Sequence, residues 1–336
     1  MGTRYISDQN KVAMIYESGT YATVSGTGKW LGEVTDNSID DAENYIEDRF
    51  LGDASRSVAR HERGPNDVTG TVTYNPVDMN LVAHAIGSVT ETSGTSFTHN
   101  AVEIGTDVNQ NPFTSGTGQD LNTPYSFTLE DSKQAPGTGK NFIRTVNGCV
   151  LNTVTINASQ GEKVSIDAEW LGQGLTFSSG ATTSVTVASQ KPYLWSDASL
   201  TVAGSSIDTA KDVSLSIDQG IEGPHYLNGS RAIGQPSLGN RAYELNVTAD
   251  LETSFANMLY NQFYKGGSEL NYLFDMNADT TGSLHAAITV SGARITSMGL
   301  PSTDDGVNET TFVVSAGSMS MQDWTDPAQI GSYNPF

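Results

Sequence analysis

Histidine is the residue type with the widest chemical range, since its side chain can bind a metal or move a proton near neutral pH. The sequence has five histidines, but no two stand at metal-ligand spacing, and the single cysteine, Cys149, cannot complete a site with them. A serine nucleophile needs a strained turn such as G-x-S-x-G, and the sequence contains none. We expect structural or surface roles for all five, which are His61, His84, His99, His225 and His285.

Two short glycine-rich segments resemble phosphate-binding loops, Gly26-Thr-Gly-Lys29 and Gly137-Thr-Gly-Lys140. The phosphate loop requires G-x-x-x-x-G-K followed by Ser or Thr, whereas Trp30 and Asn141 follow these lysines. We interpret both segments as turns.

One acidic segment, Asp275-x-Asn277-x-Asp279, has the alternating oxygen ligands with which a calcium loop begins. The glycine that the loop requires is replaced by Thr280, and its twelfth position is Ala286 instead of glutamate. Asp275, Asn277 and Asp279 are therefore a weak candidate cation site, and a turn between strands is the alternative. We expect no enzyme activity and no cofactor.

The charge balance is strongly acidic, with 38 Asp and Glu against 17 Lys and Arg and a net charge of −21. Such a surface repels phosphates, which argues against sequence-specific reading of nucleic acid. Two compatible interpretations remain. A carboxylate-rich, lysine-poor surface suits a halophilic cytoplasm, where salt screens the repulsion. It also suits a wall to which passing nucleic acid must not adhere.

Length and composition indicate a β-rich protein of two domains, because 336 residues is about twice a typical domain of ~150. Thr, Ser, Gly, Asn and Val recur, as in strands joined by turns. No apolar run reaches the roughly 18–20 residues that span a bilayer, and the start of the chain lacks the apolar segment of a signal peptide. We expect no membrane association and synthesis in a cytoplasm.

The sequence compared with itself shows an internal repeat. Ser55-Arg56-Ser57-Val58 aligns with Ser230-Arg231-Ala232-Ile233 at an offset of 175 (231 − 56), and Val72-Thr73 aligns with Val247-Thr248 at the same offset. Further on, Val146-Asn147-Gly148 aligns with Val290-Ser291-Gly292 at 144 (292 − 148), and Tyr125-x-Phe127 aligns with Tyr272-x-Phe274 at 147 (274 − 127). The drop implies about 30 extra residues in the first copy, which the Gly-, Thr- and Ser-rich stretch 88–118 can supply.

These offsets define the expected domain organisation. A first domain covers residues 19–177 with an insertion at about 88–118, a linker follows at 178–189, and a second domain covers 190–320. Residues 1–18 and 321–336 are expected to be extensions that could reach a neighbouring molecule.

Each copy shows alternating apolar and polar residues typical of half-buried strands, one long irregular arm and one helix. The arms are 43–66 and 218–241. The helices are expected from Pro76 to Ile86 and from Ser254 to Lys265, the latter stopped by Gly266-Gly267. The fold class is therefore mainly β: two tandem β-sandwich domains, each with a flanking α-helix and a long arm loop.

Arg56 and Arg231 occupy equivalent positions in the two arms, and arginine is well suited to bind carboxylates of another subunit. A salt bridge within the arm is the alternative. The candidate inter-subunit contacts also include a carboxylate run that could instead be a solvated face, Asp40, Asp41, Glu47 and Asp48.

Several segments of the second copy resemble the tail tube (major tail) proteins of long-tailed viruses: Pro192-Tyr-Leu-Trp195 through Gly204, Ser230–Ile233, Leu245–Asp250, Phe263–Gly267 and Leu300-Pro301. The resemblance covers most of 190–320, and the first copy only through the repeat. It implies a β-sandwich whose strands join a continuous inner barrel around a lumen, with arms that contact the adjacent ring.

Single-domain members of that family form hexameric rings, so a tandem duplication implies a trimer with pseudo-sixfold symmetry. The implied partners are copies of the chain stacked into a tube, other tail proteins at the tube ends, and viral DNA passing without specific binding through an acidic lumen. The implied location is the virion tail, assembled in the host cytoplasm. The acidic composition extends the expectation to a virus of a halophilic archaeon.

Two other classes remain open at the level of sequence. The chain could be a different β-sandwich virion component, such as a decoration or baseplate protein. It could also be a carbohydrate-binding adhesin module, with tryptophans as stacking residues: Trp30, Trp170, Trp195 and Trp324.

Overall fold

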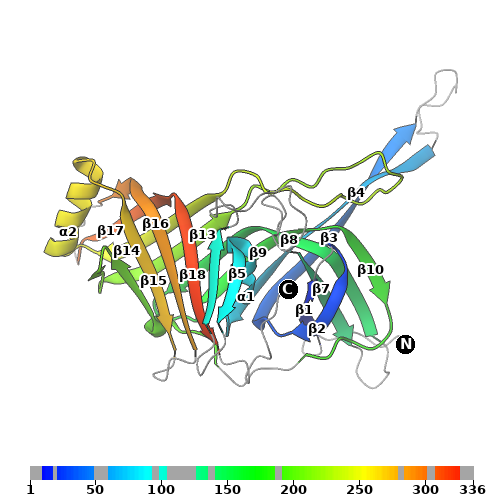
Figure 1. The fold of residues 1–336 in the computed structure, drawn as a ribbon, viewed down its shortest axis with the longest axis horizontal. Helices are drawn as coiled ribbons and strands as arrows, with labels where there is room; N and C mark the ends of the chain where they lie inside the picture. Colours follow the sequence, from blue (N-terminus) through cyan, green and yellow to red (C-terminus); the bar gives the residue numbers. More distant parts are fainter. Residues whose placement is uncertain are drawn as a thin grey trace.

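The computed structural model describes residues 10–17, 21–48, 60–92, 98–103, 126–134, 141–185, 191–278, 284–300 and 307–325. Its regular structure is almost entirely β-strand, and every strand pairing is antiparallel (Figure 1). The expected fold class, mainly β, is confirmed.

The alternation seen in the sequence explains the strands. In β13 (Ala210–Asp218), Val213, Leu215 and Ile217 are buried, while the residues between them lie on the opposite face. A strand turns successive side chains to opposite faces, so this pattern buries one face of a sheet and leaves the other polar.

A central sheet runs the length of the molecule, in the order β3-β4-β9-β8-β13-β14-β17-β16. Its first four strands come from the N-terminal half of the chain and its last four from the C-terminal half, so the pairing of β8 with β13 joins the two halves. Besides β13, its strands are β3 (Gly32–Asp48), β4 (Arg60–Pro76), β9 (Ser165–Gly172), β8 (Asn141–Ser159), β14 (Ala242–Asp250), β17 (Glu309–Ala316) and β16 (Leu284–Gly299).

Each half adds an outer sheet. The N-terminal outer sheet has the order β2-β1-β7-β8-β10, and the C-terminal outer sheet has the order β12-β11-β15-β16-β18-β6-β5. Their remaining strands are β1 (Lys11–Glu17), β2 (Val24–Lys29), β7 (Phe127–Gln134), β10 (Gly174–Ser178), β11 (Ala198–Val202), β12 (Ser205–Ser206), β15 (Leu270–Asn277), β18 (Ser318–Thr325), β6 (Thr98–Glu103) and β5 (Gly87–Thr92).

Two long strands, β8 and β16, pass from an outer sheet into the central sheet. The change of sheet falls at Gly148 in β8 and at Gly292 in β16, which have φ of 64° and 62°. Glycine suits both bends because a side chain is strained at such positive φ.

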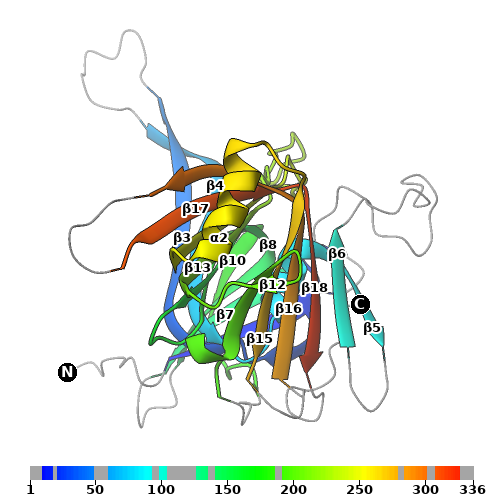
Figure 2. The ribbon, with the colours of Figure 1, turned by 90° about the vertical axis from the view of Figure 1, so that its left-hand side faces the viewer.

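Two helices accompany the sheets. α1 (Asn80–Ile86) is buried between the halves and packs on β8 and β18, whereas α2 (Thr253–Leu259) lies at one end of the molecule (Figures 1 and 2). A π-helical turn, Tyr260–Tyr264, continues α2 and packs on β16, so the helix expected over 254–265 is confirmed. The expected start of the first helix at Pro76 is wrong, because Pro76 ends β4 opposite Gly32.

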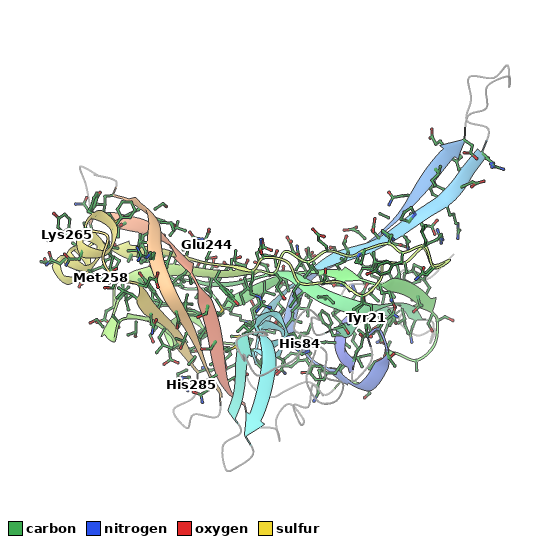
Figure 3. The ribbon with its side chains drawn as sticks, turned by 45° about the horizontal axis from the view of Figure 1, so that its top comes forward. Tyr21, His84, Glu244, Met258, Lys265 and His285 are labelled. Atoms are coloured by element: carbon green, nitrogen blue, oxygen red, sulfur yellow. The ribbon has the colours of Figure 1, made fainter. Side chains whose placement is uncertain are left out.

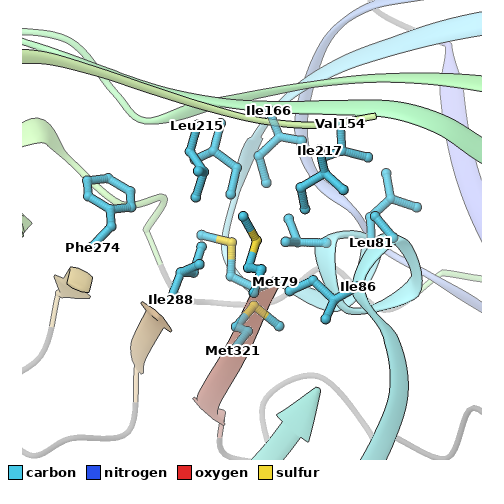
Figure 4. Packing of buried hydrophobic residues seen from close by; sticks show 14 of the residues in the cluster. Met79, Leu81, Ile86, Val154, Ile166, Leu215, Ile217, Phe274, Ile288 and Met321 are labelled. Carbon is cyan, nitrogen blue, oxygen red and sulfur yellow. The ribbon is translucent and has the colours of Figure 1, made fainter. Parts of the chain in front are cut away.

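One hydrophobic core spans both halves. Around α1, side chains of the N-terminal half meet those of the C-terminal half in a single cluster (Figure 4). The labelled members of that cluster are Met79, Leu81, Ile86, Val154, Ile166, Leu215, Ile217, Phe274, Ile288 and Met321.

The two arms differ in structure. The first is the outer part of the β3–β4 hairpin, which projects from the body (Figure 1). The second, between β13 and β14, has two isolated bridges and no strand: Glu222 pairs with Ser237 within the arm, and Ala232 pairs with Asn66 of the first arm. It lies against the first arm, where the Asn66 N–H donates to the Arg231 carbonyl (2.9 Å).

The expected insertion and extensions are partly integral to the sheets. In the 88–118 stretch, the β5–β6 hairpin pairs with β18 of the C-terminal half, and residues 104–118 lie outside the described residues. The boundaries expected at residues 18 and 320 do not coincide with the ends of the sheets. β1 is flanked by β2 and β7, and β18 continues to Thr325.

Candidate functional site

The histidines that the structure places have structural surroundings. His84 on α1 is buried, its ring stacks on Tyr16 at 5.3 Å, and its Nδ1 lies 2.8 Å from the Asn80 carbonyl oxygen. Burial lowers the pKa of His84 to about 4, so its ring stays neutral at physiological pH. Figure 3 shows His84 in the middle of the molecule, far from any end.

The candidate cation site is not assembled among the described residues. The Asp275 carboxylate contacts the His285 ring across β15 and β16, Asn277 is the last residue of β15, and Asp279 lies outside the described residues. No cluster of three acidic, histidine or cysteine side chains suited to a metal occurs in the described part of the chain.

A buried carboxylate that the sequence analysis missed, Glu17, fastens the N-terminal outer sheet. It accepts hydrogen bonds from the backbone N–H groups of Gly148 (2.8 Å) and Ala22 (2.9 Å) and from the hydroxyls of Ser126 and Thr128 (2.6 Å each). Four donors compensate the loss of hydration, so the role of Glu17 is structural. The signal was present, since Glu17 directly ends the apolar run Val12–Tyr16.

A second buried acidic pair lies where the halves meet. Asp323 on β18 accepts a hydrogen bond from the Met79 N–H (3.3 Å) before α1, and Asp78 accepts one from Asn80 (3.1 Å). Burial, and then the charge of Asp323, raise the pKa of Asp78 to about 7. These residues couple the start of α1 to the far half of the chain.

The exposed face of the central sheet is polar and acidic. A hydrogen-bonded row crosses it: Thr73 donates to Asp167 (2.7 Å), Asn157 donates to Asp167 (2.9 Å), and Ser214 donates to Asn157 (2.8 Å). The row runs from β4 through β9 and β8 to β13, so it continues across the junction of the halves. The carboxylates on this face are Glu33, Asp36, Asp40, Asp167, Glu169, Asp212, Asp218, Glu244, Asp250 and Glu309. They outnumber the cations beside them, Lys163, Lys211 and Arg294.

Both ends of the central sheet are open within the described part of the chain. β3 pairs only with β4, and the inner segment of β16, residues 294–299, pairs only with β17. An edge strand presents backbone groups that another strand can bind. One such group, the Ile39 carbonyl, accepts a hydrogen bond from Arg144 (3.3 Å).

The structure places the predicted contact residues as follows. Arg231 bonds Glu43 of the first arm (3.3 Å) within the same chain, and Arg56 lies outside the described residues. On the projecting hairpin, Asp48 pairs with Arg60 (2.6 Å) and Glu47 is exposed. Asp40 and Asp41 are exposed on the open strand β3. A role of these residues between subunits stays a prediction.

The two halves repeat one pattern of strand pairing. The pairing of β8 with β9 has a register shift of one residue, a β-bulge, between Leu151 and Thr153. The pairing of β16 with β17 has one between Ile295 and Ser297, 144 residues further on (295 − 151). β3 and β4 slip between Val34 and Asp36, and β13 and β14 slip between Ala210 and Asp212, at an offset of 176 (210 − 34).

The same pairings revise one detail of the repeat. Leu129 pairs with Val146 and Tyr272 pairs with Val290, so position 129 corresponds to 272, an offset of 143 (272 − 129). The offset of 147 taken from the two Tyr-x-Phe segments is therefore four residues out of register.

Equivalent positions in the halves differ in polarity. Across β15, β16 and β18, Phe274, Ile288 and Met321 stand side by side and are buried at the junction. Their counterparts across β7, β8 and β10 are Asp131, Arg144 and Phe177. Arg144 and Asp131 form an ion pair (2.5 Å), and Phe177 is 61% exposed.

Large exposed aromatic side chains occur at both ends of the molecule. Phe177 and Phe142 contact each other at 5.7 Å in the N-terminal half, and Tyr260 and Tyr264 contact each other at 5.8 Å after α2. Figure 3 shows the α2 end, with Met258 and Lys265, opposite the end that carries Tyr21. Exposed apolar patches of this kind mark binding surfaces.

Of the four tryptophans predicted for a glycan-binding site, the structure describes the side chains of Trp30, Trp170 and Trp195. Trp170 is buried against Gly70 in the core, Trp195 is 41% exposed, and the side chain of Trp324 lies outside the description. Trp170 therefore cannot stack on a sugar. No helix in the described part of the chain is long and apolar enough to cross a membrane.

Comparison with known proteins decides the family. The sequence matches the phage tail tube protein family over residues 7–317. The chain belongs to this family. The tail tube proteins are structural, so this chain is a β-rich structural component of the virion.

Among solved structures, the chain is similar to the SPP1 tail tube, determined by solid-state NMR and cryo EM, at 10% identity and a TM-score of 0.27. That match covers 55% of this chain and 84% of the other. No curated protein matches the sequence.

Proposed function

We propose that copies of this chain assemble through their central sheets into rings that stack into the tail tube, and that viral DNA passes through its acidic lumen into the host. The observation that carries the proposal is a central sheet that, among the described residues, ends in an open strand on both sides while its exposed face is polar. Head-to-tail joining of such edges closes a ring, and rings that stack with a fixed rotation make a tube.

We further propose that the chain is a tandem duplication and that three chains form one pseudo-sixfold ring. The repeated slips in strand pairing support this, since both halves share them at nearly constant offsets. Each half then supplies four central strands in the same order along the ring.

The face with the row Thr73, Asp167, Asn157 and Ser214 is proposed to line the lumen. Its carboxylates outnumber its lysines and arginines, so the face repels DNA phosphates, whereas an excess of lysine or arginine there would bind them and release counterions. The same acidity supports a halophilic host, because high salt screens repulsion between carboxylates of neighbouring chains. Assembly is proposed to take place in the host cytoplasm, with other tail proteins at the tube ends and no membrane involved.

Electron microscopy of negatively stained, concentrated protein in high salt tests the proposal. Hollow tubes or trimers are expected, and the yield should fall at low salt. Monomers alone under these conditions would contradict assembly.

Charge reversal tests the assigned lumen face separately. Tubes of the Glu169→Lys, Glu244→Lys variant should retain DNA on co-sedimentation at about 0.15 M salt. Wild-type tubes, and tubes with Glu62→Lys on the projecting arm, should not. DNA retention by the arm variant alone would place the lumen on another surface.

A further inference from the structure

We infer that one end of a molecule binds the opposite end of the next copy. The two strands that meet there pair in the same register as β8 and β13, which join the two halves inside the chain. The inference rests on the proposed self-assembly, and it names the residues that meet. The partner is a second copy of this chain, presenting β3 to the inner segment of β16.

The register follows from the internal junction. There β8 and β13 pair so that Thr153 is opposite Asp218 and Thr155 is opposite Ser216. β16 corresponds to β8 at an offset of 144 (297 − 153), and β3 corresponds to β13 at 176 (218 − 42). The pairs expected between copies are Ser297 with Ala42, Met298 with Asp41, Gly299 with Asp40, and Leu300 with Ile39.

The helices and the exposed aromatic side chains agree with the same correspondence between the two halves. Inside the chain, α1 of one half packs on β8 and on β18 of the other half, where Met321 is 3% exposed. α2 with its π-helical turn packs on β16, and the counterpart of Met321 is Phe177 on β10. In the contact between copies, Phe177 therefore lies against the α2 end, where Tyr260 and Tyr264 are 51% and 62% exposed.

The junction inside the chain and the end that faces the next copy differ in polarity. The junction inside the chain is apolar, with Phe274, Ile288 and Met321 buried. The end facing the next copy carries the Asp131–Arg144 ion pair at two of the three corresponding positions. Replacing the apolar pair by a largely buried ion pair leaves Phe177 as the exposed apolar side chain among these three positions of the free chain.

Disulfide trapping tests the register. Directly opposite residues in an antiparallel pair have Cα atoms about 4.5–5.5 Å apart, which suits a disulfide. The Ala42→Cys, Ser297→Cys variant, assembled and mildly oxidised, should give covalent chain dimers and larger multiples on a non-reducing gel. Native Cys149 is buried and does not interfere.

Two matched variants control this experiment. Thr153→Cys with Asp218→Cys reproduces the geometry inside one chain and should cross-link within the monomer. Ser38→Cys with Ser297→Cys is four residues out of register, about 13 Å along the strand, and should not cross-link. Tubes that form without Ala42–Ser297 cross-links, while the internal pair oxidises, would overturn the register and leave the tube function standing. If no oligomer forms under reducing conditions, both proposals fail.

Variants at opposite ends test the aromatic contact. Phe177→Asp and Tyr264→Asp should each fail to form rings or tubes, because each destroys one end and both side chains are exposed enough to spare the fold. An equimolar mixture should give heterodimers and nothing larger, since one intact end remains on each chain. Either variant assembling like wild type, or a mixture that stays monomeric, would overturn the contact, with circular dichroism verifying that both variants are folded.

Discussion

Gly148 and Gly292 hold the same backbone conformation, φ of 64° and 62°, at the points where β8 and β16 leave an outer sheet for the central sheet. The bends let one strand belong to two sheets, and so fix how each outer sheet covers the central one. Their surroundings differ: a Cβ added at Gly148 would lie 2.9 Å from the Tyr21 ring, whereas at Gly292 the nearest atom is 3.7 Å away.

Alanine at these bends should separate backbone strain from crowding. Both Gly148→Ala and Gly292→Ala should lose about 1–2 kcal/mol of unfolding free energy, because a Cβ is unfavourable at positive φ. Gly148→Ala should lose at least about 1 kcal/mol more through the contacts with Tyr21 and with the Cβ of Gln173. Urea unfolding of both variants measures the difference, and equal losses would show that Tyr21 and Gln173 both move aside freely.

The Glu17 carboxylate should not tolerate an amide in its place. Its Oε1 accepts from the Gly148 N–H and its Oε2 from the Ala22 N–H, so either orientation of a glutamine sets its NH₂ against a backbone donor. Glu17→Gln should cost roughly 1–3 kcal/mol of unfolding free energy. The exposed Glu33→Gln, which removes only the surface pair with Lys163, is the control and should cost less than about 1 kcal/mol. Similar losses in both would contradict a structural role specific to Glu17.

Asp78 should make stability fall as pH rises. Its pKa is about 7 in the folded protein against 3.8 as the reference, so between these values the folded state binds a proton that the unfolded state lacks. The stability linked to this proton is complete below the unfolded pKa and is lost as pH rises through 7. Asp78→Asn should flatten this decline and be more stable than wild type at about pH 8, measured by urea unfolding.

Asp323 provides a second readout of the same pair. Since its charge contributes to the raised pKa of Asp78, Asp323→Asn should shift the decline to lower pH without abolishing it. An unchanged profile in Asp78→Asn would show that another group causes the decline.

Arg231 should matter for the placement of the second arm more than for global stability. Its guanidinium bonds Glu43 at the surface, so Arg231→Ala should change unfolding free energy by less than about 1 kcal/mol. Hydrogen exchange over residues 225–234 should become faster, because the ion pair holds this segment on the first arm together with the backbone contact to Asn66 and the His225–Asp67 pair (3.0 Å). Arg60→Ala, at the outer part of the hairpin, should leave this segment unchanged.

The sequence predicted well those features that depend on local pattern. Alternation identified β13 and β14, and the apolar spacing with Gly266-Gly267 identified the second helix. The alignment of the two copies was harder to predict from sequence. Tyr-x-Phe occurs in both copies by chance, whereas the strand pairing depends on register shifts that no particular residue type marks. Pro76 shows the same limit: proline suits a first helical turn and also the end of a strand, and its pairing with Gly32 decides between them.

The candidate site was predictable only in part. Arg231 binds a carboxylate, and the partner described by the structure, Glu43, is in the same chain because the second arm folds along the first. The polar ion pair Asp131–Arg144 and the exposed Phe177 carry no sequence motif. They stand out only when compared with Phe274, Ile288 and Met321, a comparison that requires the strand pairing.

The pairing of β13 with β8 has a kinetic consequence. The link between these strands keeps β13 near β8 at an effective concentration of the order of millimolar, far above that of separate chains. This junction therefore forms in an intramolecular step, whatever the protein concentration, and its apolar side chains are covered before the chain meets another. Under the proposed assembly, every second contact between domains around a ring is already formed within a chain. The rate of nucleation therefore depends on a lower power of protein concentration than it would for separate halves.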